Sequence, residues 1–208
     1  MTATPENPLR LFLIRHGETA WSLSGQHTGS TDIPLTAHGE TEAEALAPLL
    51  GQIQFVHVLT SPMQRARRTC ELGGLGGDAI DEPDLAEWNY GDYEGERSCD
   101  IHRTRPGWNV FRDGCPNGET PQQVSDRADR LIARLRTIQG NVALFSHGHF
   151  GPALATRWVE LPIVAGRHFP LNTASLNILS YSPAHPDVPV ISLWNATAKL
   201  FQAKSADA

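Results

Sequence analysis

Two histidines in the sequence each follow a short apolar run and precede a glycine. Residues 15–17 (RHG) come directly after residues 11–14 (LFLI), and residues 146–148 (SHG) come directly after residues 141–145 (NVALF). Glycine allows a tight turn and a close approach of the backbone to a ligand, and the arginine before the first histidine adds a permanent positive charge. This combination suits an anion site. Taken alone, a histidine at such a position is more often a structural hydrogen-bonding residue.

Other polar side chains strengthen the case for an anion. Arg65 lies in the predicted first turn of a helix, where unpaired backbone N–H groups and a guanidinium together suit phosphate. Glu87 lies in an aromatic-rich loop, residues 85–91 (LAEWNYG). Apolar surroundings and a nearby phosphate both favour a carboxyl group that keeps its proton and can donate it. Residues 26–32 (QHTGSTD) form a polar loop with donors that can line a pocket. Each feature is weak alone, and together they indicate a phosphate site.

The second histidine segment leaves other interpretations open. His147 and His149 have the H-x-H spacing of a metal site, which would make the protein a metallohydrolase. No acidic cluster with bridging spacing accompanies them, which disfavours this alternative. His147 could also be a capping or core residue, or a protonated partner of phosphate. A serine hydrolase is disfavoured because no G-x-S-x-G segment occurs.

The segments that must position these residues alternate between predicted strands and helices. The predicted strands are residues 11–14, 55–59, 141–145, 175–179 and 188–193. The predicted helices are a helix from the N-cap Thr36 to the stop Gly51, a helix opened by Ser61-Pro62 and running to residue 72, a helix opened by Thr120-Pro121 with apolar positions as far as Ile138, and residues 150–159. Residues 73–78 (GGLGGD) are expected to form a loop, and residues 82–119 an excursion over the top of the sheet. This alternation predicts an α/β fold with a mainly parallel sheet, in which ligands bind outside the carboxyl ends of the strands.

Composition and charge limit the classes of protein. The 208 residues are 40% hydrophobic and 19% charged, which suits a single domain over residues 1–208. The net charge of -6 argues against nucleic acid as a partner. The three cysteines lack metal or disulfide spacing, the polar N-terminus lacks a signal-peptide pattern, and no apolar stretch is long enough to span a membrane. We therefore expect a cytoplasmic protein without membrane contact.

Six segments spread over nearly the whole chain carry a family resemblance: LFLIRHGETAWS, GQHTGSTDIPLTAHG, TSPMQRARRT, LAEWNYGDYEG, GCPNGET and LFSHGHF. Together they resemble the histidine phosphatase superfamily, the phosphoglycerate mutase-like proteins. The resemblance implies a three-layer α/β/α sandwich and an enzyme that needs no metal or other cofactor. It implies that His16 is the phosphorylated nucleophile, with Glu87 as general acid. The charged phosphate pocket would consist of Arg15, Arg65 and His147. The matching substrate-binding positions are Ser22, Thr28, Gly29, Tyr90, Gly148 and His149.

Two departures from the cofactor-dependent mutases of that family favour hydrolysis. Ser22 stands where the mutases usually carry asparagine, which weakens the transfer of that residue's phosphate contact. The segment between Glu87 and Thr120 is short and lacks the paired arginines of the mutases, since Arg103 and Arg105 are not adjacent. The segments WSLSGQHTGSTD and EWNYGDYEG are most similar to the sugar-bisphosphate and broad-specificity phosphatases.

These observations predict a phosphomonoester hydrolase that acts on a small phosphorylated metabolite, such as a sugar phosphate or bisphosphate, through a phosphohistidine. Inorganic phosphate would be the product. A phosphoglycerate mutase-type phosphotransferase is the nearest alternative, and a non-catalytic phosphosugar-binding module is an alternative of another class. His102, Arg103 and Arg105 could bind a second phosphate or face solvent. At least half of the aromatic residues between positions 88 and 111 are expected to be packing residues, and a homodimer is common in the family.

Overall fold

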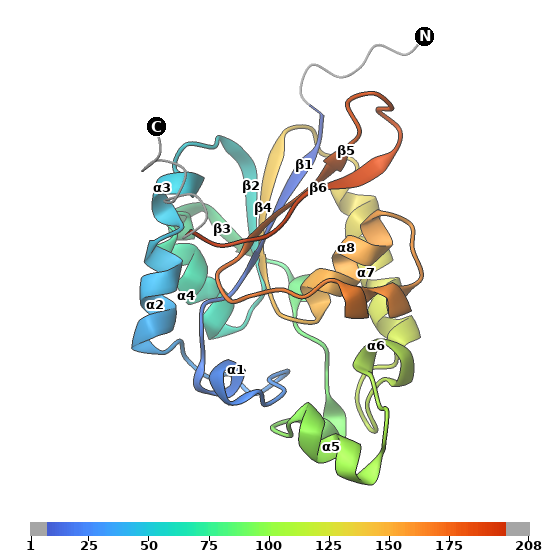
Figure 1. Cartoon of the computed structure of the whole chain (residues 1–208). Coiled ribbons are helices and arrows are strands. Elements are labelled where there is room, and N and C mark those ends of the chain that lie inside the picture. Colours follow the sequence, from blue (N-terminus) through green and yellow to red (C-terminus); the bar gives the residue numbers. More distant parts are fainter. Residues whose placement is uncertain (1–7, 199–208) are drawn as a thin grey trace, which may run out of the picture.

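The computed structural model describes residues 8–198, so most of the polar N-terminal segment, whose signal-peptide pattern was considered above, lies outside the described residues. A six-stranded sheet in the order β3-β2-β4-β1-β5-β6 forms the centre of the molecule (Figure 1). The strands are β1 (Arg10–Arg15), β2 (Phe55–Thr60), β3 (Ala79–Asp81), β4 (Asn141–Ser146), β5 (Leu176–Tyr181) and β6 (Pro189–Ala196). The first four strands are parallel to one another. Strand β5 is antiparallel to β1, and β6 is antiparallel to β5. The predicted mainly parallel sheet is confirmed.

Helices cover both faces of this sheet (Figure 1). On one face lie α2 (Ala37–Glu44), α3 (Ala47–Leu50) and α4 (Gln64–Leu72), and on the other lie α7 (Pro121–Leu135) and α8 (Phe150–Trp158). The remaining helices are α1 (Ala20–Ser24), α5 (Ser98–Thr104) and α6 (Val110–Asp113), with short 3-10 turns η1 (Gly76–Asp78), η2 (Pro83–Leu85), η3 (Gly91–Tyr93) and η4 (Ile163–His168). The architecture is therefore the expected three-layer sandwich. No helix within residues 8–198 is long and apolar enough to cross a membrane.

The apolar run in β1 is explained by the two helical layers. Leu11 and Leu13 belong to the core cluster on the α7 and α8 side, whereas Phe12 and Ile14 belong to the cluster on the α2 to α4 side. Successive side chains of a strand point to opposite faces, so a strand covered on both sides is apolar at every position.

Three neighbouring parallel strands bring the predicted site residues to one edge of the sheet. In the register of β1 and β4, Arg15 pairs with Ser146, and the N–H of His16 donates to the carbonyl of Ser146 at 3.0 Å. On the other side of β4, the N–H of Ser61 after β2 donates to the carbonyl of Phe145 at 2.9 Å. The segments that follow β2, β4 and β1 therefore meet beyond the carboxyl ends of these strands.

Several predicted element bounds need correction. The helix predicted from Thr36 to Gly51 is two helices, because Pro48 has no N–H to donate to the carbonyl of Glu44 and lies in the first turn of a second short helix that begins at Ala47. The helix predicted to open at Ser61-Pro62 begins at Gln64, with Met63 as N-cap. The loop predicted over residues 73–78 contains a 3-10 turn.

One further helix ends earlier than predicted, and one short strand was not predicted. The helix opened by Thr120 ends at Leu135, so Ile138 lies beyond it, although the predicted N-cap is present as a capping box with Gln123. The three-residue strand β3 (Ala79–Asp81) was not predicted, because it is too short to show a hydrophobic period.

The excursion predicted over residues 82–119 lies beyond the carboxyl edge of the sheet and carries η2, η3, α5 and α6 (Figure 1). Trp88, Trp108 and Phe111 are buried in the core cluster beside α7 and α8. The expectation that at least half of the aromatic side chains in this region serve packing is confirmed.

Candidate active site

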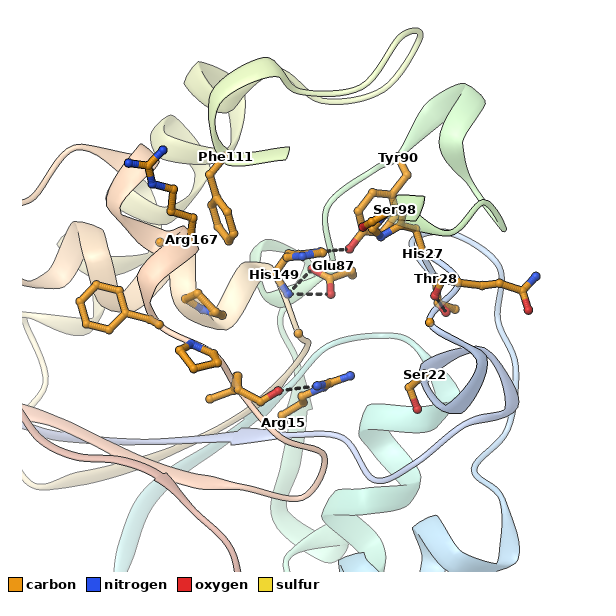
Figure 2. A pocket seen from close by; sticks show the side chains of 18 of the residues that line it. Arg15, Ser22, His27, Thr28, Glu87, Tyr90, Ser98, Phe111, His149 and Arg167 are labelled. Carbon is orange, nitrogen blue, oxygen red and sulfur yellow. Dashed lines mark hydrogen bonds between the residues drawn. The ribbon is translucent and has the colours of Figure 1, made fainter. Parts of the chain in front are cut away.

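A cavity of about 350 Å³ opens at the carboxyl edge of the sheet. Its walls come from the segments after β1 and β4, from the 82–119 excursion, and from the segment that follows α8. Figure 2 shows how these side chains surround the cavity. The lining residues are Arg15, His16, Ser22, Gly25, Gln26, His27, Thr28, Glu87, Tyr90, Ser98, Phe111, Gly148, His149, Pro152, Gly166, Arg167, Phe169, Pro170 and Leu171.

His16 is held as a neutral imidazole with one ring nitrogen available. Its Nδ1 lies 2.7 Å from the carbonyl oxygen of Gly17, and because that oxygen can only accept, Nδ1 carries the proton. Nε2 is then the unprotonated nitrogen and has no hydrogen-bond partner among the described residues. Burial, followed by the positive charges of Arg15 and Arg65, holds the pKa of His16 well below its usual value. The ring therefore stays neutral, with Nε2 unprotonated as a nucleophile must be.

Arg15 lies at the inner end of the cavity with part of its guanidinium unpaired. One Nη donates to the carbonyl of Leu171, but Nε is buried without any partner in the described part of the chain. A buried N–H without an acceptor is costly unless a ligand completes it. Gly148 packs directly on this guanidinium, since a Cβ there would lie 3.2 Å from Cζ of Arg15.

Arg65 and His147 lie in a layer behind His16 and do not line the cavity. Both side chains are completely buried, and the rings of His16 and His147 are 5.2 Å apart. Nε of Arg65 donates to Nδ1 of His147 at 3.2 Å, so Nε2 of His147 carries the proton and donates to Oγ of Ser61 at 2.7 Å. Burial and then the charge of Arg65 hold the pKa of His147 well below its usual value. His147 is thus neutral in this arrangement, not the protonated partner considered from the sequence.

The rest of the Arg65 guanidinium fixes the polar loop predicted at residues 26–32. Nη1 donates to the carbonyl of Thr31, and Nη2 donates to the carbonyls of Thr28 and Gly29 at 3.0 and 2.9 Å. From the opposite side, the carboxylate of Glu94 accepts from the N–H groups of Gly29 and Thr31. The loop is therefore held between a buried cation and a carboxylate, which fixes Thr28 at the cavity wall.

Glu87 is buried against the beginning of α8. Its Oε1 accepts from the N–H groups of Trp88 at 2.9 Å and Phe150 at 2.8 Å. Its Oε2 accepts from the N–H of His149 at 2.9 Å, as Figure 2 shows. Helix N-termini favour negative charge, so α8 holds this carboxylate in one place. The side chain also lines the cavity, which places a proton-transfer group beside the space that substrate would occupy.

A wall of uncharged polar rings lies beside Glu87. The hydroxyl of Tyr90 lies 2.5 Å from Nδ1 of His149, and the ring of His27 stacks on Tyr90 at 4.7 Å. Burial raises the pKa of Tyr90 well above its usual value and lowers the pKa of His149 to about 4, with Arg15 adding to the second shift. The Tyr90 hydroxyl is therefore the donor, and His149 keeps its proton on Nε2. Burial also lowers the pKa of His27 to about 4.

Most of the remaining predicted substrate-binding residues line the cavity, and one instead fixes the loop behind it. Ser22, Thr28 and Gly148 line the cavity. The hydroxyl of Ser22 also forms the capping box of α1 with Thr19. Gly29 does not line the cavity, and it serves through its backbone contacts with Arg65 and Glu94.

Three residues whose role the sequence left open lie away from the cavity. The side chain of Arg103 is 73% exposed and pairs with Asp100, Arg105 is exposed, and Nε2 of His102 contacts the carbonyl of Trp108. The H-x-H pair does not converge on a metal position, because both ring nitrogens of His147 are engaged by Arg65 and Ser61 while His149 turns to Tyr90. Within residues 8–198 no group of three side chains could hold a metal ion.

Sequence reasoning missed Ser61, Glu94, and the wall formed by residues 166–171. Ser61 was considered only as a helix cap, yet its hydroxyl accepts from His147. Glu94 lies within the matched segment LAEWNYGDYEG, but nothing in its spacing indicates a contact with residues 29 and 31. Residues 166–171 have no motif at all, and only the tertiary fold shows that they face the cavity.

The fold and the site together define a class of protein: an α/β enzyme with a neutral, buried histidine beside an unpaired arginine and a carboxylate. Comparison with known proteins agrees. Residues 11–197 match the model of the histidine phosphatase superfamily (branch 1), and the chain belongs to this superfamily. It is 43% identical over 188 residues to an acid phosphatase of Mycobacterium tuberculosis, which covers 88% of this chain and 92% of that protein.

Two further comparisons extend this result. The chain is 35% identical over 187 residues to sedoheptulose 1,7-bisphosphatase of Saccharomyces cerevisiae, covering 74% of this chain and 69% of the yeast protein. A solved structure of the product of a Mycobacterium tuberculosis open reading frame superimposes with a TM-score of 0.84 at 41% identity, covering 91% of this chain and 98% of that one. The predicted family and fold are confirmed.

Proposed function

We propose that this protein hydrolyses small phosphate monoesters, with sugar phosphates or sugar bisphosphates as substrates, through a phosphohistidine at His16. The observation that carries the proposal is the state of His16. Its Nδ1 proton is engaged by Gly17, its pKa is held well below the usual value, and it lines a cavity together with Arg15, whose Nε has no partner among the described residues. The phosphatases among its relatives support hydrolysis as the reaction.

In the first step, Nε2 of His16 attacks the phosphorus atom and the bond from phosphorus to the leaving oxygen breaks. Glu87 gives a proton to that oxygen, and the alcohol leaves. In the second step, Glu87 takes a proton from water, the water oxygen bonds to phosphorus, and the bond from phosphorus to Nε2 breaks. Inorganic phosphate is released and His16 returns to its neutral form. Neither step requires a metal or other cofactor.

The phosphoryl oxygens would be held from the inner end of the cavity. Nε of Arg15 is positioned to donate to one of them, and this contact would complete its unpaired N–H. We propose that Arg65 and His147 act from the layer behind His16. Arg65 keeps one Nη1 hydrogen without a partner among the described residues, and His147 can turn its Nε2–H from Ser61 to a phosphoryl oxygen. Each charge-assisted hydrogen bond contributes about 1.5–3 kcal/mol.

The remaining sugar would lie against the uncharged wall of His27, Tyr90 and His149, with Ser22 and Thr28 beside it. Neutral donors and acceptors suit hydroxyl groups. Two expectations from the sequence, a cytoplasmic location and a homodimer, stay predictions, as does the single domain over residues 1–208.

The test is phosphate release from a panel of phosphosugars in excess EDTA, with wild type beside His16→Ala. We expect activity that survives EDTA and disappears in the variant, together with an acid-labile phosphohistidine in the wild-type protein only. Residual turnover by His16→Ala would remove the covalent mechanism, and abolition by EDTA would revive the metal alternative. Transfer of the label to a second position of the sugar, without phosphate release, would show a mutase.

A further inference from the structure

One charged side chain that lines the cavity is not used by the mechanism above. Arg167, at the end of η4, is exposed at the rim, on the wall formed by residues 166–171 (Figure 2). Its Nε donates to Nε2 of His168 at 3.0 Å, and neither Nη atom forms a hydrogen bond with a described residue. Arg167 also forms no ion pair with a carboxylate in the described part of the chain. Both ends of its planar fork are therefore available to a ligand.

The wall that carries Arg167 is firmly fixed on two sides. Gly166 is buried so closely against Phe111 that a Cβ would lie 2.7 Å from the ring. Beyond Arg167, the carbonyl of Pro170 accepts from Nε1 of Trp194 at 2.9 Å, and the carbonyl of Leu171 accepts from Arg15. The position of Arg167 relative to the inner end of the cavity is thus set by the fold.

The same short segment links the two arginines of the cavity. Arg15 is bound to the carbonyl of Leu171, four residues after Arg167. Four residues of chain span roughly 13 Å at most, so these two backbone positions are separated by no more than the length of a small extended metabolite. Apolar side chains of Phe111, Pro152 and Phe169 line the same cavity. A ligand that reaches both arginines would carry its charges at its two ends and an uncharged middle.

The charges of the residues that line the cavity also suit a ligand with two negative groups. Glu87 is the one carboxylate among the described residues that line it, and backbone N–H groups hold it at the start of α8. Burial keeps the pKa values of His27 and His149 near 4, so these rings add no charge at neutral pH. Arg15 and Arg167 therefore leave the cavity positive at both ends.

We propose that Arg167 is a specificity-determining residue that binds a second anionic group of the substrate, a phosphate or a carboxylate, while Arg15 binds the phosphoryl group that is transferred. The proposal rests on the proposed function. The second anionic group of the substrate would then bind away from Arg103 and Arg105, which were considered from the sequence as residues that could bind a second phosphate. A bidentate contact between a guanidinium and an oxyanion is also directional, which an ammonium in the same place would reproduce only in part.

The test compares substrates that differ in the second anion. Steady-state constants are measured for a hexose bisphosphate, the two matching hexose monophosphates, phosphoglycerate and nitrophenyl phosphate. The proteins are wild type, Arg167→Gln, Arg167→Lys and the control Arg103→Gln, which removes an exposed arginine outside the cavity. For Arg167→Gln we expect KM for the bisphosphate to rise about tenfold, or about 1.4 kcal/mol, with kcat nearly unchanged. The KM of Arg167→Lys for the bisphosphate should lie between the values of wild type and Arg167→Gln.

Hexose monophosphates and nitrophenyl phosphate should be hydrolysed equally by all four proteins. A rise in KM for phosphoglycerate would show that the site accepts a carboxylate, whereas no rise would restrict it to a second phosphate. An unchanged KM for the bisphosphate in Arg167→Gln, or equal losses on mono- and bisphosphates, would overturn the proposal. Wild-type protein that hydrolyses none of these esters would instead overturn the proposed function.

Discussion

Replacing Arg65 by lysine should destabilise the protein while keeping a positive charge behind His16. The guanidinium is fully buried and donates to the carbonyls of three loop residues and to Nδ1 of His147. An ammonium offers its hydrogens from a single point and cannot reach acceptors on both sides of the original fork. We expect at least two of the four acceptors to lose their partner. A buried polar group without a partner costs about 1–3 kcal/mol, so the free energy of unfolding should fall by about 2–6 kcal/mol.

Urea unfolding at neutral pH measures this change, and thermal unfolding supports it, since about 1 kcal/mol corresponds to a shift in Tm of about 2–4 °C for a chain of this length. Arg68→Lys is the matched control. Arg68 lies on the same helix, its side chain is 46% exposed, and it pairs with Glu40 and Glu71. Its replacement should change stability by no more than about 0.5 kcal/mol. An Arg65→Lys protein as stable as this control would refute the structural role assigned to the guanidinium.

A pH profile separates the charge of Arg65 from its hydrogen bonds. Arg15 and Arg65 both contribute to the low pKa of His16, after burial. Arg65→Gln removes that charge, so the pKa of His16 should rise towards its ordinary value, whereas Arg65→Lys should keep it low. The acid limb of kcat/KM, which reports groups of the free enzyme, should therefore lie at higher pH in Arg65→Gln than in Arg65→Lys. Identical acid limbs would show that Arg65 has no electrostatic effect on His16.

Two further predictions concern Glu87 and His149. Glu87→Gln can keep its oxygen at the Oε1 position, where Trp88 and Phe150 donate, so the protein should fold but lose general acid catalysis. We expect about a 10²–10⁴-fold loss of kcat on sugar phosphates and a far smaller loss on nitrophenyl phosphate, and equal losses would contradict leaving-group protonation. For His149, the pKa is lowered to about 4 by burial and then by Arg15, so the unfolded chain binds more protons between about pH 4 and 6.5. Stability due to this group is present above pH 6.5 and is lost as pH falls towards 4, by up to about 1.4 kcal/mol per pH unit. His149→Gln should reduce the slope of unfolding free energy against pH in that window, and an unchanged slope would exclude His149 as the source.

The sequence predicted the parts of the site that a local pattern determines. Residues 11–14 and 142–145 are apolar at every position because helices cover both faces of the sheet, and that pattern predicts two buried strands. Because parallel strands end at the same edge, the residues after them meet. The start of a helix at Thr120-Pro121 was likewise predictable, since the hydrogen bonds of its cap lie within four residues.

Contacts between distant segments could not be predicted in this way. Glu94 acts on Gly29 and Thr31 across more than sixty positions of sequence, with no periodicity to indicate the pairing. Arg65 was predicted to bind phosphate, but nothing in the sequence indicated that its guanidinium also donates to the carbonyls of a loop that has no secondary structure of its own. Arg167 lies in a segment whose composition is that of any surface turn, and its place at the cavity depends on how α8 and β5 are connected.

The arginines of this protein differ in whether their charge is already neutralised, and that difference supports the assignment of Arg15 and Arg167. On the surface, most described arginines form ion pairs with carboxylates, as Arg134 does with Glu82 and Asp84 and Arg157 does with Asp129. A paired arginine attracts a further anion weakly, because its field is largely cancelled within the protein. The two arginines of the cavity have no such partner in the described chain, and Arg15 even has a buried N–H without an acceptor. The protein has more acidic than basic residues, yet Glu87 is the one carboxylate among the described residues that line the cavity, and it forms no ion pair with Arg15 or Arg167. The simplest physical account is a substrate that supplies the missing negative charges, one at each end of the cavity.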